Sequence, residues 1–267
     1  RAAGCAARAK VPARARQMAL RAFVRAFGVD EREAEFPLEA YSTLEAFFTR
    51  RLRPGARPIV AGESTVVSPV DGRVAAVGEA VAGRLLQAKG CDYSLERLLD
   101  SPLDGQPFAG GAYVTLYLSP RDYHRIHAPL GGEIEGYRYI PGDLFPVNAI
   151  GCRWVPELFC TNERLVTYLK TSAGRVAVVK VGALCVGRIR ASYDPDLVTN
   201  AGRSPSRRWY EKPISIRKGE DLGVFELGST VILLFEKNRV ALDGALVEGA
   251  SVRMGQAIAH IKMSGAS

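Results

Sequence analysis

Asp71, His127 and Ser229 are three residues whose side-chain types together could support nucleophilic catalysis. A histidine can remove the proton of a serine hydroxyl, and a carboxylate can orient that histidine. His124 lies three residues before His127 and is a second candidate for proton transfer. Because two of the three histidines fall in the segment 122–128, we favour a functional role for them over a purely structural one.

The immediate neighbours of Ser229 decide which chemistry is open to it. The apolar run 230–235 predicts a fully covered strand, and a Gly-Ser step before a strand is most often only a turn. The sequence around Ser229 lacks the Gly-x-Ser-x-Gly pattern of many serine hydrolases. Instead Gly228 precedes Ser229 directly, and glycine has an unhindered carbonyl and tolerates strained backbone angles. The step therefore suits attack by Ser229 on the peptide bond that precedes it.

Each of these residues also has a structural interpretation. An Asp before a Gly, as in Asp71-Gly72, is most often a turn former that bonds to its own backbone. His124 and His127 would share one face of a helix but would point to opposite faces of a strand. For His260, which stands alone near the C-terminus, we favour a structural role.

The composition excludes several classes of protein. The 267 residues are 47% hydrophobic and 24% charged, which is enough for one large domain or one domain with an appendage. The five cysteines show no Cys-x-x-Cys spacing and only three histidines are present, so we predict a reducing compartment, no disulfide framework and no metal site. No apolar stretch has the length of a bilayer-spanning helix, and no apolar segment typical of a signal peptide follows the basic start.

The net charge of +8 is concentrated at the N-terminus, where seven basic residues and no acidic residue precede Asp30. In segment 12–27 the apolar residues recur with a helical period and arginines form another stripe, which predicts a basic amphipathic helix ended by Gly28. Such a helix suits an anionic membrane surface, although its apolar stripe could instead dock on its own domain. Nucleic-acid binding is disfavoured, because no aromatic residues interleave with the basic ones as a stacking platform.

The rest of the chain predicts an α+β fold that is mostly β. A second short helix is expected over Thr43–Leu52, capped by Thr43 and ended by Pro54. Beyond residue 60, short strands separated by Gly and Pro form an antiparallel-rich pattern. These strands are predicted over 113–119, 133–140, 164–169, 176–184 and 230–235. We therefore divide the chain into an N-terminal helical membrane-association region, 1–58, and a β-rich catalytic domain, 59–267.

Three segments predict short hairpins of the kind found in lipoyl-type barrel-sandwich domains. The segments 66–79, 216–228 and 252–261 each combine two strand-like stretches with a glycine turn. A lipoyl carrier needs a lysine at such a turn, whereas the first segment has Asp71, Gly72 and Arg73 there. The polar segment 194–212, broken by Ser and Pro, predicts a surface loop.

Several motifs stand in the order found in phosphatidylserine decarboxylases, and the chain resembles that family from about residue 20 to residue 261. The motifs are LGST (227–230), VSPVDGRV (67–74), YHRIHAP (123–129), FFTRRLRPGARPI (47–59), LFPVN (144–148) and NER (162–164). LGST alone is a weak signal. Together with the Asp-Gly and His-x-x-His-x-Pro segments in register it is a strong one.

The resemblance implies that the protein makes its own prosthetic group. His127, with Asp71 behind it, would deprotonate Ser229, and Ser229 would attack the Gly228 carbonyl. Elimination and hydrolysis would then leave a pyruvoyl group at residue 229, with a β chain (1–228) and an α chain (229–267) as products. The pyruvoyl cofactor would form a Schiff base with phosphatidylserine and release carbon dioxide and phosphatidylethanolamine. The proton transfers of this second reaction are assigned to His124.

A lipid substrate also gives the basic N-terminal helix a partner. The resemblance implies contact with an anionic membrane surface and a peripheral location on the cytoplasmic face of the cell membrane. A homodimer is left open, and so is a soluble amino acid as substrate, because related pyruvoyl enzymes decarboxylate these. Two rival functions predict an uncut chain: a serine hydrolase that uses Asp71, His127 and Ser229, and a non-enzymatic lipoyl-like or membrane-binding module.

Overall fold

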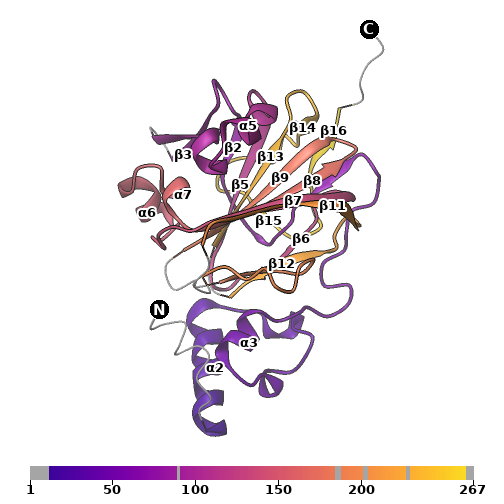
Figure 1. Ribbon diagram of the computed structural model, residues 1–267. Helices are drawn as coiled ribbons and strands as arrows, with labels where there is room; N and C mark the ends of the chain where they lie inside the picture. Colours follow the sequence, from indigo (N-terminus) through magenta and orange to yellow (C-terminus); the bar gives the residue numbers. More distant parts are fainter. Residues whose placement is uncertain (1–11, 89–90, 184–187, 201–203, 227–228, 263–267) are drawn as a thin grey trace.

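A computed structural model describes residues 12–88, 91–183, 188–200, 204–226 and 229–262 of the protein (Figure 1). A helical N-terminal part lies at one end of a larger β-rich part. The N-terminal part contains helix α2 (Ala13–Phe27), the 3-10 helices η1 (Glu31–Glu33) and η2 (Leu38–Ala40), and helix α3 (Leu44–Phe48).

Helix α2 confirms the predicted amphipathic helix. Gly28 ends it in the left-handed conformation, at φ 67°, and its N–H donates to the carbonyl of Val24. On the apolar stripe, Leu20 is fully buried in a cluster with Phe47 of α3, whereas Phe27 is 44% exposed. One part of the stripe therefore docks on the protein itself, and another part stays open to solvent.

Helix α3 begins where the sequence predicts and ends earlier. The hydroxyl of Thr43 caps it by accepting a hydrogen bond of 3.0 Å from the N–H three residues further on. The expected end at Leu52 is wrong, because the helix stops at Phe48 and Leu52 forms an antiparallel bridge with Ala34. The tertiary contact thus replaces the last turn of the predicted helix.

An eight-stranded antiparallel sheet forms the centre of the β-rich part (Figure 1). Its strands lie in the order β11–β7–β8–β9–β13–β5–β2–β15, and every neighbouring pair is antiparallel. In this order the strands are Ser206–Ile216, Gly132–Ile140, Arg164–Thr171, Gly174–Gly182, Ser229–Phe235, Ala112–Leu118, Gly72–Glu79 and Ser251–Val252. The five strands predicted from the sequence are confirmed as β5, β7, β8, β9 and β13, although β9 ends at Gly182.

Two smaller sheets pack against one face of the large sheet. Their orders are β1–β16–β14, with bounds Thr65–Val67, Ala257–Ile261 and Val240–Leu242, and β10–β12–β6, with bounds Ile189–Ala191, Asp221–Phe225 and Arg125–His127. Val114, Leu116 and Leu118 of β5 share one buried cluster with these sheets. Their alternation along the strand confirms the predicted two-faced pattern of this segment.

Short helices and a small ribbon cover the opposite face. Tyr113 of β5 belongs to a second buried cluster, which all of these elements except α5 share with the large sheet. The elements are β3 (Arg84–Ala88), β4 (Cys91–Ser94), α4 (Leu95–Leu99), α5 (Pro102–Gly105), η3 (Gln106–Phe108), α6 (Ala149–Trp154) and α7 (Leu158–Thr161). The large sheet is therefore buried on both faces.

The three expected hairpins do not pair as hairpins. The stretches before and after each glycine turn enter different sheets: β1 pairs with β16 while β2 pairs with β5, and β15 pairs with β2 while β16 pairs with β1. Likewise β12 pairs with β10 and β6, and not with β11. Each turn thus connects two layers, because the apolar faces on its two sides are buried in different sheets.

The expected loop 194–212 is wrong in its second half, because β11 begins at Ser206. This strand forms the edge of the large sheet, and its charged residues stay exposed there. The α+β, mostly β fold class is confirmed. The sheets within the described ranges are open, so no closed barrel forms there. No helix in these ranges is long and apolar enough to cross a membrane.

Candidate active site

Ser229 is the first residue of β13, in the middle of the large sheet. It lies opposite Leu118, the last residue of β5, and opposite Gly182, the last residue of β9. The side chain is 1% exposed, and its hydroxyl has no hydrogen-bond partner among the described residues. A buried hydroxyl without a partner is costly, and such groups in native proteins often have a chemical role.

Asn162 and Glu163 hold the strand end next to Ser229. The amide of Asn162 donates to the carbonyl of Gly182 at 2.8 Å, and the N–H of Gly182 donates to the carbonyl of Glu163 at 2.8 Å. The same Asn162 side chain binds both backbone groups of Phe145, at 2.9 and 3.0 Å. In the sequence, Asn162 and Glu163 belong to the NER motif and Phe145 to the LFPVN motif, and no role was assigned to these motifs from the sequence alone. Their presence in two motifs was the only signal that could have pointed to this clamp.

His124 is a fully buried base with one open nitrogen. Its Nδ1 lies 2.8 Å from the carbonyl oxygen of Asp122, so Nδ1 carries the hydrogen and Nε2 keeps a lone pair. No described group binds Nε2, and the ring of Phe48 packs on the imidazole at 4.0 Å between ring centroids. Burial, together with the charge of Arg50, lowers the pKa of His124 to about 3. The imidazole is therefore neutral at physiological pH.

His124 and Ser229 are connected through one short segment. The carbonyl of His124 accepts a hydrogen bond of 3.0 Å from the N–H of Phe225, four residues before Ser229. Two buried polar groups without partners, Nε2 of His124 and the hydroxyl of Ser229, thus belong to adjoining parts of the fold.

His127 differs from His124 in that both of its ring nitrogens are occupied. Nδ1 lies 2.8 Å from the carbonyl oxygen of Gly219, and Nε2 lies 3.2 Å from the hydroxyl of Tyr123. Burial is the main cause that lowers the pKa of His127. His127 is the last residue of strand β6, whereas His124 precedes the strand, and the two rings have separate partners.

Asp71 is bonded to Arg57 and not to either histidine. Nε of Arg57 donates to both carboxylate oxygens, at 2.8 and 3.0 Å, and the N–H of Met254 donates to Oδ1 at 2.8 Å. The bond to Met254 replaces the local Asx bond that a turn-forming Asp would make. The structure therefore does not link Asp71, His127 and Ser229 into one hydrogen-bonded chain. It does place His127 beside the turn, because its N–H donates to the carbonyl of Pro69 at 2.9 Å.

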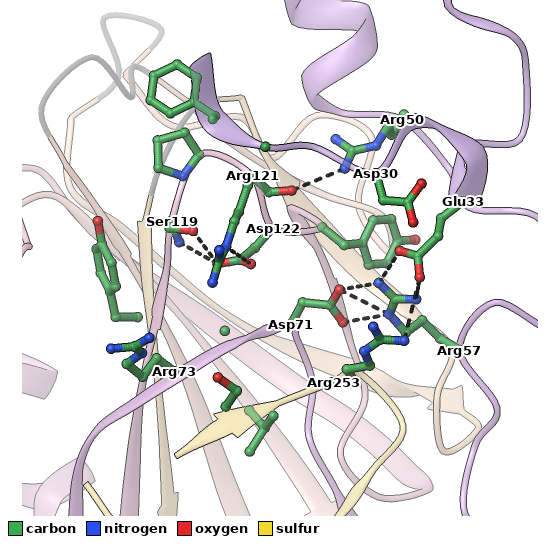
Figure 2. Close-up of a pocket in the computed structure, with 18 of the residues that line it drawn as sticks. Asp30, Glu33, Arg50, Arg57, Asp71, Arg73, Ser119, Arg121, Asp122 and Arg253 are labelled. Atoms are coloured by element: carbon green, nitrogen blue, oxygen red, sulfur yellow. Dashed lines mark hydrogen bonds and ion pairs between the residues drawn. The ribbon is translucent and has the colours of Figure 1, made fainter. Parts of the chain in front are cut away.

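Arg57 also binds Glu33, at 2.7 and 3.0 Å, and so joins the N-terminal part to the turn that holds Asp71 (Figure 2). Glu33 lies 24 residues before Arg57 and Asp71 lies 14 residues after it. No local pattern in the sequence therefore indicates these two ion pairs. The network is nearly buried at Arg57 and Asp71, where an unpaired charge is costly.

Replacing Arg57 by methionine is expected to lower the free energy of unfolding by about 3–5 kcal/mol, because two carboxylates lose their partner. Urea denaturation in the uncut Ser229→Ala background measures this change. The control is Arg253→Met, since Arg253 is 70% exposed and lies 3.6 Å from Glu33; an exposed pair contributes about 1 kcal/mol or less. Equal losses in the two variants would contradict the assignment of Arg57 as a buried link.

A pocket of about 750 Å³ opens between the N-terminal part and the ends of β2 and β5. Figure 2 shows Asp71 and Arg57 on one side of it and Ser119, Arg121 and Asp122 on the other. Asp71 is the one predicted site residue that lines it. Gly228, the expected cleavage position, lies outside the described residues.

The fold and the site define an α+β protein with a buried serine hydroxyl at the start of a central strand and a buried neutral histidine, His124, whose backbone is hydrogen-bonded to the segment before that strand. The family model of phosphatidylserine decarboxylase matches residues 44–260. A phosphatidylserine decarboxylase proenzyme of Myxococcus xanthus is 55% identical over 258 residues, which cover 97% of this chain and 92% of that protein. Proteins of the same name from Anaeromyxobacter sp. and Brevibacillus brevis are 53% and 46% identical, with 96% and 92% of this chain and 91% and 89% of theirs covered. The chain belongs to the phosphatidylserine decarboxylase family.

Proposed function

We propose that this protein cuts itself between Gly228 and Ser229, converts Ser229 into a pyruvoyl group and then decarboxylates phosphatidylserine to phosphatidylethanolamine. Family membership supports the activity. The observation that supports Ser229 as the reacting residue is its burial: the residue is 1% exposed, and its hydroxyl has no partner in the described structure.

This burial disfavours the rival serine hydrolase. A hydrolase must bring an external acyl group to its nucleophile in the uncut chain, where the hydroxyl is enclosed. The proposed decarboxylase meets its lipid only after the bond before residue 229 has been broken. The peptide bond before Ser229 needs no access, because it is covalently attached to the same residue. Intramolecular attack also gains from the fixed position of the two reacting groups.

The proposed cleavage conserves atoms and charge in three steps. The Ser229 hydroxyl loses its proton to a base and attacks the Gly228 carbonyl, and the C–N bond breaks as the amine is protonated, which leaves an ester. Loss of the Cα proton of residue 229 then expels the Gly228 carboxylate and leaves a dehydroalanine. Tautomerisation to the imine and addition of water release ammonia, so that residue 229 ends as a pyruvoyl group.

Two histidines can act as bases, and we assign them to different reactions. His127 is the proposed base for the first step, supported by its position beside the turn of Asp71. Burial lowers the pKa of His127, and the negative charges of Asp221 and Asp71 act against this shift. We assign the proton transfers of the decarboxylation to His124, whose Nε2 is unoccupied in the described structure.

Residue 229 suits a pyruvoyl group, since it is enclosed by β5 and β9 and its side chain lacks a partner that modification would remove. When formed, the group supplies an electron sink for loss of carbon dioxide from an attached amino acid. We assign to His124 the protonation of the carbon that loses carbon dioxide.

An intact-mass measurement under denaturing conditions tests the proposal first. We expect two chains that meet between Gly228 and Ser229, the smaller one blocked at its N-terminus and reducible by borohydride. The purified protein should then release carbon dioxide much faster from phosphatidylserine than from free serine. One uncut chain that reacts with a fluorophosphonate would favour the hydrolase instead.

We also propose that α2 brings the enzyme to an anionic membrane. Arg14, Arg21 and Arg25 are exposed on this helix, and so are the apolar Met18 and Phe27. A surface that combines basic and apolar side chains binds anionic lipid headgroups and their acyl boundary. The basic charge of the N-terminus thereby gains a partner that the β-rich part does not supply.

Exchange of Arg14, Arg16, Arg21 and Arg25 for glutamine is expected to weaken binding to phosphatidylserine-containing vesicles by about tenfold or more, because each basic residue near such a surface contributes roughly 1 kcal/mol. Vesicle sedimentation measures the change. The control variant has glutamine at four exposed basic residues at the opposite end of the large sheet, Lys170, Lys237, Arg239 and Lys262. Equal losses in both variants would show that α2 is not the anchor.

A further inference from the structure

Arg50 is a buried cation that lacks an anionic partner. Arg50 lies just after the end of helix α3, and the residue is 5% exposed. It donates to the carbonyls of Phe47 and Arg121 at 3.5 and 3.4 Å, which are long hydrogen bonds, and its Nε has no partner. No described carboxylate lies within ion-pair distance of it, whereas nearby Arg57 binds two.

Such a guanidinium is unsatisfied as it stands. It presents five N–H donors, and burial without an acceptor costs more for a charged group than for a neutral one. Burial indeed lowers the pKa of Arg50. A planar cation with free donors is suited to the oxygens of a phosphate or a carboxylate, which would supply the missing charge.

The surroundings of Arg50 leave room for an anion. Arg50 lines the pocket of about 750 Å³, together with the exposed Arg73 and with Arg121 (Figure 2). The carboxylates that line the pocket already have partners: Arg57 binds Asp71 and Glu33, Arg32 binds Asp30, and Ser119 binds Asp122. An anion in the pocket would therefore meet Arg50 without displacing an existing ion pair.

The pocket also adjoins the proposed reacting centre. Arg50 donates to the backbone of Arg121, three residues before His124, and its charge contributes to the low pKa of His124. Ser119, which lines the pocket, follows Leu118, the partner of Ser229 in the sheet. In a serine phospholipid, only a methylene and an ester oxygen separate the reacting α-carbon from phosphorus, so the phosphate must bind close to residue 229.

We infer that this pocket binds the phosphodiester of the aminophospholipid headgroup and that Arg50 is the cation that contacts it. The inference rests on the proposed function, because it names the part of the substrate that Arg50 recognises. It also gives the N-terminal part a role in substrate selection, since a free amino acid has no phosphodiester to offer.

The test compares two soluble substrates of the cleaved enzyme. Dihexanoyl phosphatidylserine, used as monomers, has the phosphodiester, and O-hexyl-L-serine keeps the amine and carboxylate but lacks it. Arg50→Gln is expected to lower kcat/KM for the phospholipid by about 10- to 100-fold, mainly through KM, as for loss of one or two charged hydrogen bonds. The loss on the ether should be at least about tenfold smaller. Arg50→Lys, which keeps the charge without the fork, should fall between wild type and Arg50→Gln.

The control is Arg51→Gln, because Arg51 is the next residue, is 61% exposed and pairs with Asp221 outside the pocket. It should leave both substrates near wild type. An equal loss on both substrates in Arg50→Gln would overturn the inference and make Arg50 a structural residue, as would no loss on either. A wild-type protein that is never cleaved would instead contradict the proposed function itself.

Competition experiments on the wild-type enzyme test the same site without any variant. Glycerophosphoethanolamine should inhibit turnover of the soluble phospholipid at concentrations where inorganic phosphate does not. Equal inhibition by the two would indicate a general anion site and overturn the headgroup assignment. Absence of inhibition by glycerophosphoethanolamine would overturn the inference as well.

Discussion

Replacing Ser229 by alanine is expected to leave a single uncut chain that releases no carbon dioxide from phosphatidylserine. Alanine has no hydroxyl to attack the preceding peptide bond, and no pyruvoyl group can arise from it. The loss should be complete in both readouts, whereas folding should be unaffected because the hydroxyl makes no hydrogen bond in the described structure. Intact mass and release of labelled carbon dioxide measure the two effects.

Two variants make this prediction specific. Thr230→Val removes the next hydroxyl of the strand, which is also buried without a partner, and should leave cleavage intact. Ser229→Cys should still be cut, more slowly, because a thiol can attack and can later be lost as sulfide. A cleaved and active Ser229→Ala protein would rule out the proposed origin of the cofactor.

The two histidines are expected to separate the two reactions. His127→Ala should remain uncut, because the proposed base of the first step is missing. His124→Gln should be cut but should decarboxylate about 100- to 10,000-fold more slowly, which is the usual contribution of general acid–base catalysis. Both variants are scored by the fraction of cut chain and by the rate of decarboxylation per cut chain.

His260→Gln is the matched control for these two variants. His260 lies on β16, outside the pocket, and both reactions should proceed as in wild type. The opposite outcome for the pair, with an uncut His124→Gln and a cut His127→Ala, would reverse the roles. It would agree with the open Nε2 of His124 in the described structure and would make that atom the base that acts on Ser229.

The sequence was sufficient for the local features of this fold. The apolar alternation of β5 predicted its two buried faces, and the run after Ser229 predicted a covered strand. Thr43 predicted the start of α3 and Gly28 predicted the end of α2, because helix capping depends on only a few neighbouring residues. These features were readable because local sequence alone determines them.

The features that the sequence did not reveal depend on contacts between distant residues. Strand pairing is one case, since the segments around each glycine turn enter separate sheets and nothing in their own pattern says so. The partners of Asp71 are another: it binds Arg57 and the backbone of Met254, 14 and 183 residues away, instead of a histidine. The motifs identified the residues of the site but not how their side chains are joined.

The position of β13 in the middle of the large sheet has a consequence for the stability of the cut protein. Every strand after residue 228 belongs to a sheet that also contains strands from before it. Once the peptide bond is gone, unfolding becomes dissociation, and the melting temperature should rise with protein concentration, unlike that of the Ser229→Ala precursor. Unfolded mature enzyme must also reassemble from two separate chains, one of which no longer has its serine. The lifetime of the mature form is therefore set by its slow rate of unfolding, and not by a reversible equilibrium between folded and unfolded protein.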